Sequence, residues 1–160
     1  MTLTLPGLLP LRNMLEDLLG RDVSVTPADP VGIGDLPTMV VALYTDNASR
    51  LVAVLGMDMT LAANAGAALG LLPAGAAEDS IEEKQLSPML AENIKEMCNI
   101  LTGLLNREGA PHVKLHGVVL PGEPLPSDAA AHLVALGRRL DVKADISRYG
   151  GGLFALSLAD

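Results

Sequence analysis

The chain has 160 residues and a mass of 16.6 kDa, which is the size of one domain with a substantial core. Apolar residues make up 49% of it but aromatic residues only 2%, so Leu, Val, Ala and Met must fill that core. The net charge is −8, from 11 Lys and Arg against 19 Asp and Glu, and the basic residues form no patch. Because phosphates attract clustered cations and bases stack on aromatic rings, this composition argues against a nucleic acid partner. We expect a single domain over residues 1–160.

Several features favour a cytoplasmic protein without a membrane span. Cys98 is the only cysteine, so no intrachain disulfide can form, which suits a reducing cytosol. Residues 1–20 carry no basic leader before their apolar part and do not resemble a secretory signal. The longest uncharged run, residues 59–77, is mostly Ala and Gly and contains Asn64 and Pro73. That composition favours a soluble helix with small packing residues.

The first part of the chain reads as a helix, a strand and a hairpin. An apolar stripe at helical spacing and a glycine at its end predict a helix over residues 10–19 that stops at Gly20. A short strand follows at residues 23–25, and three prolines and two glycines make residues 27–37 a loop. Two apolar runs, residues 39–44 and 51–57, flank turn formers and predict a hairpin.

The second part resembles the first loosely, because it too has a helix, a strand and a later hairpin. An Ala-rich helix over residues 60–72 is broken by residues 73–80, and Ser87 and Pro88 then start a helix that can run to Asn106 and stop at Gly109. The remaining expected elements are a strand at 113–120, a helix from Ser127 to about Gly137, and strands at 140–147 and 153–158 joined by a turn at residues 148–152. The two halves therefore predict an α/β protein built as a pseudo-duplicated sheet with helices packed on it.

The helix that starts at Pro88 has the most informative pattern. At 100° per residue its apolar side chains fall on one side, while Glu96 and Asn99, three residues apart, project together from the opposite side. Gly103 lies one turn further on, where glycine costs helix stability unless a neighbour or partner approaches closely. Periodicity alone favours the simpler interpretation, in which Glu96 and Asn99 are ordinary solvated residues and Gly103 eases packing against a neighbour.

Residues 96–103 spell E-x-x-N-x-x-x-G, which resembles the signature of the CheC/CheX/FliY phosphatases of bacterial chemotaxis. Residues 13–23 are similar to the opening helix and strand of the CheX branch, and the length, hairpins and acidic composition also match a CheX-like domain. The resemblance implies a pseudo-duplicated α/β sheet with one long exposed E-x-x-N helix. It also implies a cytoplasmic homodimer whose partner is a phosphorylated, CheY-like response regulator.

The resemblance further implies roles for individual residues. Asn99 would orient a water for in-line attack on the aspartyl phosphate of the regulator, and Glu96 would pair with the regulator's active-site lysine. Glu92, Ile100 and Gly103 would contact the partner. The protein would be an aspartyl-phosphate phosphatase with no cofactor of its own, because the Mg²⁺ would be bound by the regulator. Phosphoryl transfer fits this division of labour, since it needs positioning and charge neutralisation more than covalent chemistry.

Departures from the family pattern leave two other hypotheses open. Glu92 stands where the family has Asp or Ser, Leu104 where it has a polar residue, and the nearest proline to the expected strand position is Pro121. These departures favour a non-catalytic CheX-like module that binds a signalling partner through the same helix. The Ala, Leu and Met content suggests, more weakly, a sensor of an apolar small molecule. The first helix has the reverse order, Asn13-x-x-Glu16, so we expect one site at most.

Three other groups of residues have simple structural interpretations. His112 and His116 fall in a strand, where a spacing of four residues separates them by about 13 Å, too far to share a metal ion. Cys98 lies on the apolar side of its helix, which indicates a buried structural thiol. The methionines occupy mostly apolar positions and are expected to fill the core. We therefore expect no metal site.

Overall fold

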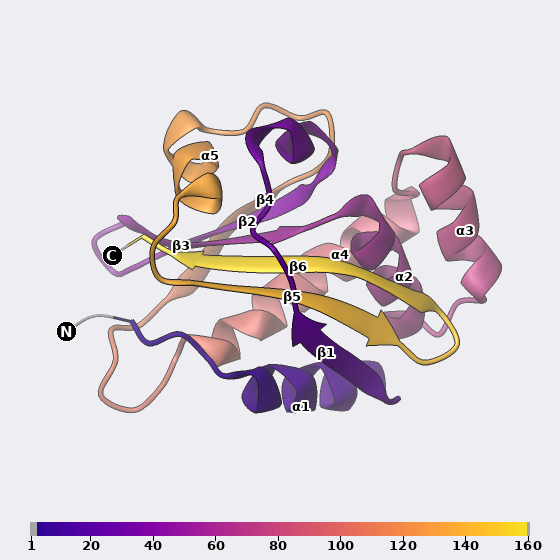
Figure 1. Ribbon diagram of the computed structural model, residues 1–160, viewed down its shortest axis with the longest axis horizontal. Coiled ribbons are helices and arrows are strands. Elements are labelled where there is room, and N and C mark those ends of the chain that lie inside the picture. The colour runs from indigo at the N-terminus through magenta and orange to yellow at the C-terminus, as the bar shows by residue number, and fades with distance from the viewer. Residues whose placement is uncertain (1–2, 160) are drawn as a thin grey trace.

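The computed structural model describes residues 3–159 and contains one antiparallel sheet of six strands in the order β1-β5-β6-β3-β2-β4 (Figure 1). Each expected strand is present, because alternating or continuous apolar residues at these positions pack against helices on the sheet. The strands are β1 (Val23–Pro27), β2 (Val40–Thr45), β3 (Leu51–Met57), β4 (Lys114–Val119), β5 (Arg139–Ile146) and β6 (Gly150–Leu158).

The strand order has an internal pseudo-two-fold symmetry. The hairpin β2–β3 of the first half pairs with β4 of the second half, and the hairpin β5–β6 pairs with β1 of the first half. The two hairpins meet at the central pair β3–β6. Exchanging the halves reproduces the order, so the expected pseudo-duplicated sheet is confirmed. Each half thus completes its sheet with a strand from the other, which makes the two halves one folding unit.

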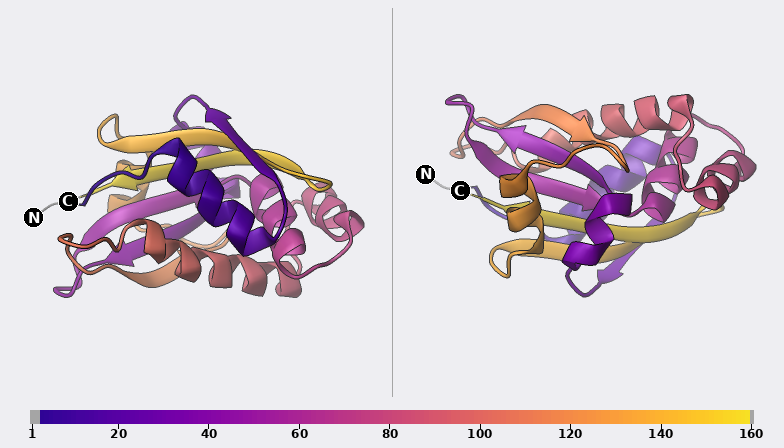
Figure 2. Two further views of the ribbon diagram at one scale, coloured as in Figure 1. Left: turned by 90° about the horizontal axis from the view of Figure 1, so that it is seen from below. Right: turned by 90° about the horizontal axis from the view of Figure 1, so that it is seen from above.

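The helices divide unequally between the two faces of the sheet (Figure 2). The larger core lies under α1 (Leu8–Leu19), α2 (Met59–Leu69) and α4 (Pro88–Ile100). On the other face, a smaller core lies under the 3-10 helix η1 (Ile33–Thr38) and α5 (Ser127–Val134). No helix within residues 3–159 is both long and apolar enough to cross a membrane.

Gly66 of α2 and Gly70, which caps its C-terminal end, set how closely α4 packs against α2. A Cβ on Gly66 would lie 3.1 Å from the backbone oxygen of Leu90, and one on Gly70 would lie 2.4 Å from Nδ2 of Asn93. The Asn93 amide uses this space to donate a 3.0 Å hydrogen bond to the carbonyl of Gly66. The expected role of these small residues in helix packing is therefore confirmed, and their partner is α4.

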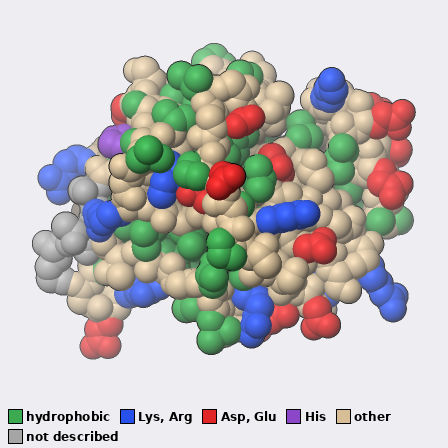
Figure 3. Space-filling model, viewed as in Figure 1, with side chains coloured by type: hydrophobic (Ala, Val, Ile, Leu, Met, Phe, Trp, Pro, Cys, Tyr) green, Lys and Arg blue, Asp and Glu red, His purple; other side chains and the backbone are tan. Residues whose placement is uncertain are grey.

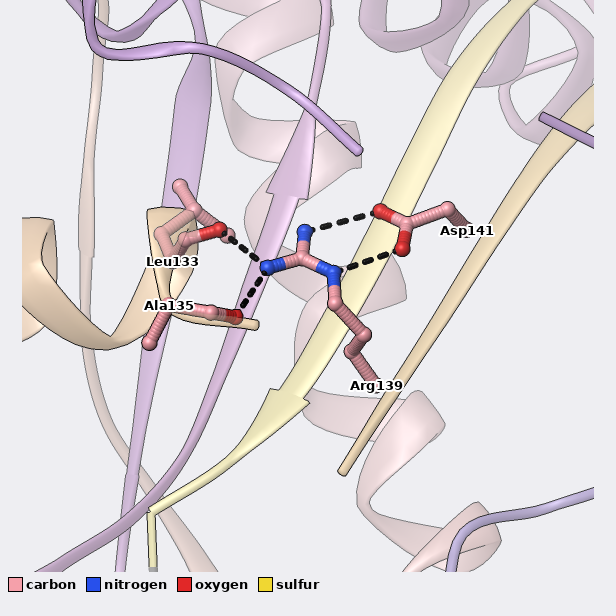
Figure 4. Close-up of polar contacts among 4 residues, drawn as sticks. All are labelled: Leu133, Ala135, Arg139 and Asp141. Carbon is pink, nitrogen blue, oxygen red and sulfur yellow. Dashed lines mark hydrogen bonds and ion pairs between the residues drawn. The ribbon is translucent and has the colours of Figure 1, made fainter. Parts of the chain in front are cut away.

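On the opposite face, a buried ion pair holds the end of α5 (Figure 4). The Arg139 guanidinium makes two hydrogen bonds to the Asp141 carboxylate, at 2.6 and 2.8 Å. It also donates to the carbonyls of Leu133 and Ala135, at 2.9 and 2.7 Å. Arg139 therefore satisfies carbonyls at the C-terminal end of α5 that have no partner inside the helix.

Three local predictions were wrong. Residues 73–80 are not simply a break, because α3 (Ala74–Glu83) begins directly after Pro73, whose fixed φ suits a helix start. Part of the expected loop at residues 27–37 forms η1. The expected turn at residues 148–152 is shorter, and the three glycines 150–152 open β6.

Close contacts explain two of the three glycines at the start of β6. A Cβ on Gly151 would lie 2.1 Å from the carbonyl oxygen of Ala144, on the paired strand. A Cβ on Gly152 would lie 2.3 Å from Oδ1 of Asp58, which caps the start of α2. These glycines are thus required by packing of β6 against β5 and α2, and the turn falls at residues 147–149.

Candidate functional site

The helix α4 begins where the sequence predicts. The Ser87 hydroxyl accepts the backbone N–H of Leu90 at 3.3 Å, and Pro88 occupies the first helical turn, where its missing N–H is not needed. The expected apolar side is buried, and Leu90, Ile94, Met97, Cys98 and Leu101 all lie in the larger core. This leaves the opposite side of α4 facing outward.

Hydrogen bonds to other elements fix α4 in place. The hydroxyl of Tyr44, a buried residue of β2, donates a 2.7 Å hydrogen bond to the carbonyl of Cys98. Asn93 attaches the same helix to α2, as described above. Burial raises the pKa of the Cys98 thiol to about 12, so this cysteine stays protonated and packs as a small apolar residue. It is the structural thiol that its position on the helix indicates.

The regular helix is shorter than the predicted run to Asn106. It ends at Ile100 and continues as a 3-10 turn, η2 (Leu101–Leu104). The hydroxyl of Thr102 donates to the carbonyl of Asn99 at 2.7 Å, and Gly103 follows. A side-chain bond of this kind and a glycine both weaken α-helical geometry, which explains the tighter turn. The change comes after Asn99, so Glu96 and Asn99 stay on one continuous helix.

The structure brings Glu96 and Asn99 together on the exposed side of α4. Neither side chain has a hydrogen bond or ion pair with any residue in the range 3–159. Glu92 is also exposed, one turn before Glu96, and its carboxylate lies 4.0 Å from the ammonium of Lys95. A carboxylate and an amide are therefore held on a rigid helix with their polar atoms unused by the fold.

Apolar residues border this polar pair, and sequence reasoning missed one of them. Ile100 is 40% exposed and Met89 is 58% exposed, and both lie within about 40° of Glu96 around the helix. Met89 lies two helical turns before Glu96, and this spacing in the sequence could have placed it on the same exposed side. Gly103 is exposed as well, but a Cβ there would lie 3.1 Å from Cε of Met14 on α1, so the chain itself already approaches this glycine.

The corresponding helix of the first half, α1, has no such free pair. The Glu16 carboxylate accepts the backbone N–H of Val23 at 3.1 Å and lies 3.7 Å from the Arg12 guanidinium. Asn13 is exposed, but its acidic neighbour is engaged in holding β1 to α1. Of these two equivalent helices, α4 alone presents a free carboxylate and a free amide three residues apart.

The histidines of the second half lie elsewhere. His112 precedes β4 and His116 belongs to it, and both are exposed. In the part of the chain that the structure describes, no three His, Cys, Asp or Glu residues are grouped so that they could hold a metal ion. The chemistry available at α4 is therefore that of hydrogen bonding: a carboxylate that can accept from a cation, and an amide that can donate and accept at once.

No protein-family model matches the chain, and no curated protein matches its sequence. Solved structures do resemble it. FliY from Thermotoga maritima is 14% identical, with 92% of this chain and 81% of that chain covered and a TM-score of 0.58. A chain of the FliG–FliM complex from H. pylori is 10% identical, with 93% and 84% covered and a TM-score of 0.57. A chain of the CheX–CheY–BeF3–Mg²⁺ complex from Borrelia burgdorferi is 16% identical, with 92% of each chain covered and a TM-score of 0.53.

These similarities define the class of fold. The protein has the CheC/CheX/FliY-type fold, a mixed α/β architecture with a six-stranded antiparallel sheet and helices packed on it. The resemblance that residues 96–103 carry is thus confirmed at the level of the fold. FliY, CheX and FliM structures all share this architecture with the chain, over more than nine tenths of its length.

Proposed function

We propose that the protein is a cytoplasmic phosphatase that dephosphorylates a response regulator of the CheY type, in chemotaxis or a related two-component pathway. The observation that carries the proposal is the free pair Glu96 and Asn99 on the exposed side of α4. The fold supports it, because a chain of similar structure comes from a complex of CheX with CheY, BeF3 and Mg²⁺.

Each side chain of the pair has a distinct role in this proposal. The Asn99 amide enters the regulator's active site and holds a water in line with the aspartyl phosphate, accepting from the water or donating to it without titrating. Glu96 pairs with the regulator's active-site lysine and fixes the register of docking. Glu92, Ile100 and Gly103 lie on the same exposed side and contact the partner.

The protein supplies positioning in this scheme and the regulator supplies the charge neutralisation. The leaving aspartate and the Mg²⁺ both belong to the regulator, so the phosphatase contributes neither a covalent intermediate nor a metal ligand. A helix is a suitable carrier for such a group, since its backbone geometry fixes the distance between Glu96 and Asn99 before the partner arrives.

A non-catalytic binding module is the second candidate function. Glu92 adds an exposed carboxylate one turn before Glu96, where it would meet the acidic pocket of a regulator. The same fold also occurs in the FliG–FliM complex, so it supports association with other proteins. In this second function, α4 binds a signalling partner but does not accelerate the loss of its phosphate.

The lifetime of a phosphorylated response regulator from the same cell tests the proposal. It is measured with no addition, with the native protein, with Asn99→Ala and with Asn13→Ala. Asn13 is an exposed asparagine on α1, so its replacement controls for the loss of a helical amide as such. We expect the native protein and Asn13→Ala to shorten the lifetime and Asn99→Ala to lose at least about 100-fold in rate, in line with other water- and charge-positioning groups.

The outcomes separate the two functions. Binding without any shortening of the lifetime would favour the non-catalytic module. Equal rates for the native protein and Asn99→Ala would remove Asn99 from the mechanism. Circular dichroism of Asn99→Ala should match the native protein, because its side chain makes no contact that the fold requires.

We also propose that the protein forms a homodimer through its sheet edges. The edge strands β1 and β4 each pair on one side only, and an unpaired edge is a surface that another strand can cover. Sedimentation at micromolar concentration should give about twice the monomer mass of 16.6 kDa. A monomeric mass at that concentration would contradict the proposal.

A further inference from the structure

The turn between α2 and α3 contains a leucine in a backbone conformation that normally belongs to glycine. Leu71 has a φ of +55°. The N–H of Leu72 donates to the carbonyl of Ala67, and that of Leu71 to the carbonyl of Ala68. This is the Schellman arrangement, whose left-handed position is usually occupied by glycine because other residues are strained there.

A glycine is present one residue earlier, and its place is fixed by α4. The Asn93 amide of α4 lies over Gly70, where a Cβ would come within 2.4 Å of Nδ2. The chain therefore uses its glycine for the contact with α4 and places Leu71 in the strained position. Tyr149 holds the turn from the other side by donating its hydroxyl hydrogen bond to the carbonyl of Leu72.

The strain at Leu71 is not offset by packing of its side chain. Leu71 is 79% exposed, although a buried leucine would gain free energy from leaving water. An exposed apolar side chain on a strained backbone adds little to the stability of the folded protein. Such an outlier is a reason to look for a partner that covers the residue.

The turn adjoins the exposed side of α4. Asn93, which touches Gly70, lies one helical turn from both Met89 and Glu96. From Asn93 to Asn99 the helix rises by only about 9 Å. A standard protein interface covers about 800 Å² on each partner, a patch roughly 30 Å across. A partner centred on Glu96 therefore reaches the turn.

The charge around the turn indicates what kind of surface fits it. Acidic side chains gather over α3 in Figure 3, and Glu78, Asp79, Glu82 and Glu83 are all exposed there. Glu92 and Glu96 add negative charge on α4. The complementary surface is positively charged and has an apolar site for Leu71 and Met89.

We propose that Leu71, together with Met89, anchors the phosphorylated response regulator beside its phosphorylation site and selects which regulator is bound. This inference rests on the proposed function and adds a specificity surface to it. Leu71 fills an apolar site on the regulator, while basic residues around that site face α3. The turn holds the leucine outward in advance, so little side-chain and backbone freedom is lost on docking.

Leu71→Gly separates a binding role from a structural one. Glycine relieves the strain and removes the side chain, so the melting temperature should rise by about 2 °C while binding weakens. Leu136→Ala is the control, because Leu136 is 84% exposed but follows α5 on the other face of the sheet. The probe is each purified receiver domain from the same genome, activated with beryllium fluoride, so that binding is measured without turnover.

We expect the dissociation constant for the bound receiver to rise about fivefold in Leu71→Gly and to change less than twofold in Leu136→Ala. With the phosphorylated receiver, KM should rise by the same factor while kcat stays within twofold. Binding unchanged in Leu71→Gly would overturn the inference and leave the phosphatase function intact. A lower melting temperature would assign Leu71 to the fold and overturn it as well. If the native protein bound no receiver, the proposed function would fail first, and the inference with it.

Discussion

The two helices α1 and α4 occupy equivalent places in the two halves of the molecule but use their polar residues differently. In α1, the Glu16 carboxylate is turned to the chain itself and binds the N–H of Val23 at the start of β1. In α4, the side chains of Glu96 and Asn99 make no hydrogen bond or ion pair within residues 3–159, and other residues attach the helix to the core. Tyr44 binds the Cys98 carbonyl, and Asn93 binds α2.

The difference shows what a helix needs in order to present polar groups to a partner. Its position must be fixed by residues other than those it presents. A buried hydrogen bond from Tyr44 and a partly buried one from Asn93 fulfil this condition for α4. In α1 the Glu16 carboxylate itself attaches the helix to β1, so it is not available to a partner. The same two residue types in reverse order therefore serve the fold and do not form a binding site.

Reversing the charge on each helix should have the largest and most contrasting effects. Glu96→Lys should weaken regulator binding at least tenfold, because the lysine would meet a cation, and should leave stability unchanged. Glu16→Lys should leave binding unchanged but lower the free energy of unfolding by about 1–2 kcal/mol, since the N–H of Val23 loses its acceptor. Calorimetric titration and urea melts of both variants measure the two effects, and a stability loss in Glu96→Lys would break the comparison.

Removing the hydroxyl that holds α4 should reduce stability moderately. Tyr44→Phe deletes the 2.7 Å hydrogen bond to the Cys98 carbonyl, so we expect a loss of about 1 kcal/mol in the free energy of unfolding. Hydrogen exchange should show faster opening of α4 than of α1. Equal changes in the two helices would mean that Tyr44 supports the whole core and not α4 in particular.

The buried thiol on α4 predicts a loss of stability at high pH. Burial raises the pKa of Cys98 from 9.0 to about 12, so between these values the unfolded chain loses a proton that the folded chain keeps. Stability is therefore unaffected below about pH 9 and falls above it, by about 1 kcal/mol at pH 10. Denaturant melts between pH 7 and 10.5 measure this loss of stability. Cys98→Ala should remove the part of the loss that comes from ionisation of the thiol. Tyr44, whose pKa burial also raises, adds a loss of the same sign that the variant retains.

The smallest expected effect concerns Gly103, the glycine where α1 and η2 approach each other. Gly103→Ala places a Cβ 3.1 Å from the free end of Met14, which can shift, so stability should change by less than about 0.5 kcal/mol. If the regulator also packs on Gly103, turnover should fall about threefold. Unchanged turnover would assign Gly103 to the contact with Met14 alone.

Much of the fold follows from periodicity in the sequence. Apolar residues alternate or run continuously in the strands and recur every third or fourth position in the helices, and each expected strand and helix is found. The errors lie where long-range contacts decide. Residues 150–152 look like a turn, but their glycines are needed because Ala144 and Asp58 lie against them. The helix α3 follows a proline and has only a weak apolar stripe, which hides it from pattern analysis.

For the candidate site, helical periodicity was enough to predict that Glu96 and Asn99 share a helix face, because three residues span nearly one helical turn. The sequence also determined the apolar side of α4, the buried thiol and the resemblance to CheX-like domains. The sequence pattern could not predict that these two side chains are free while Glu16 is engaged, since that depends on where β1 begins relative to α1 in three dimensions. The fold alone brought Leu71 beside α4, because Gly70 meets Asn93 across a distance of 23 positions in the sequence.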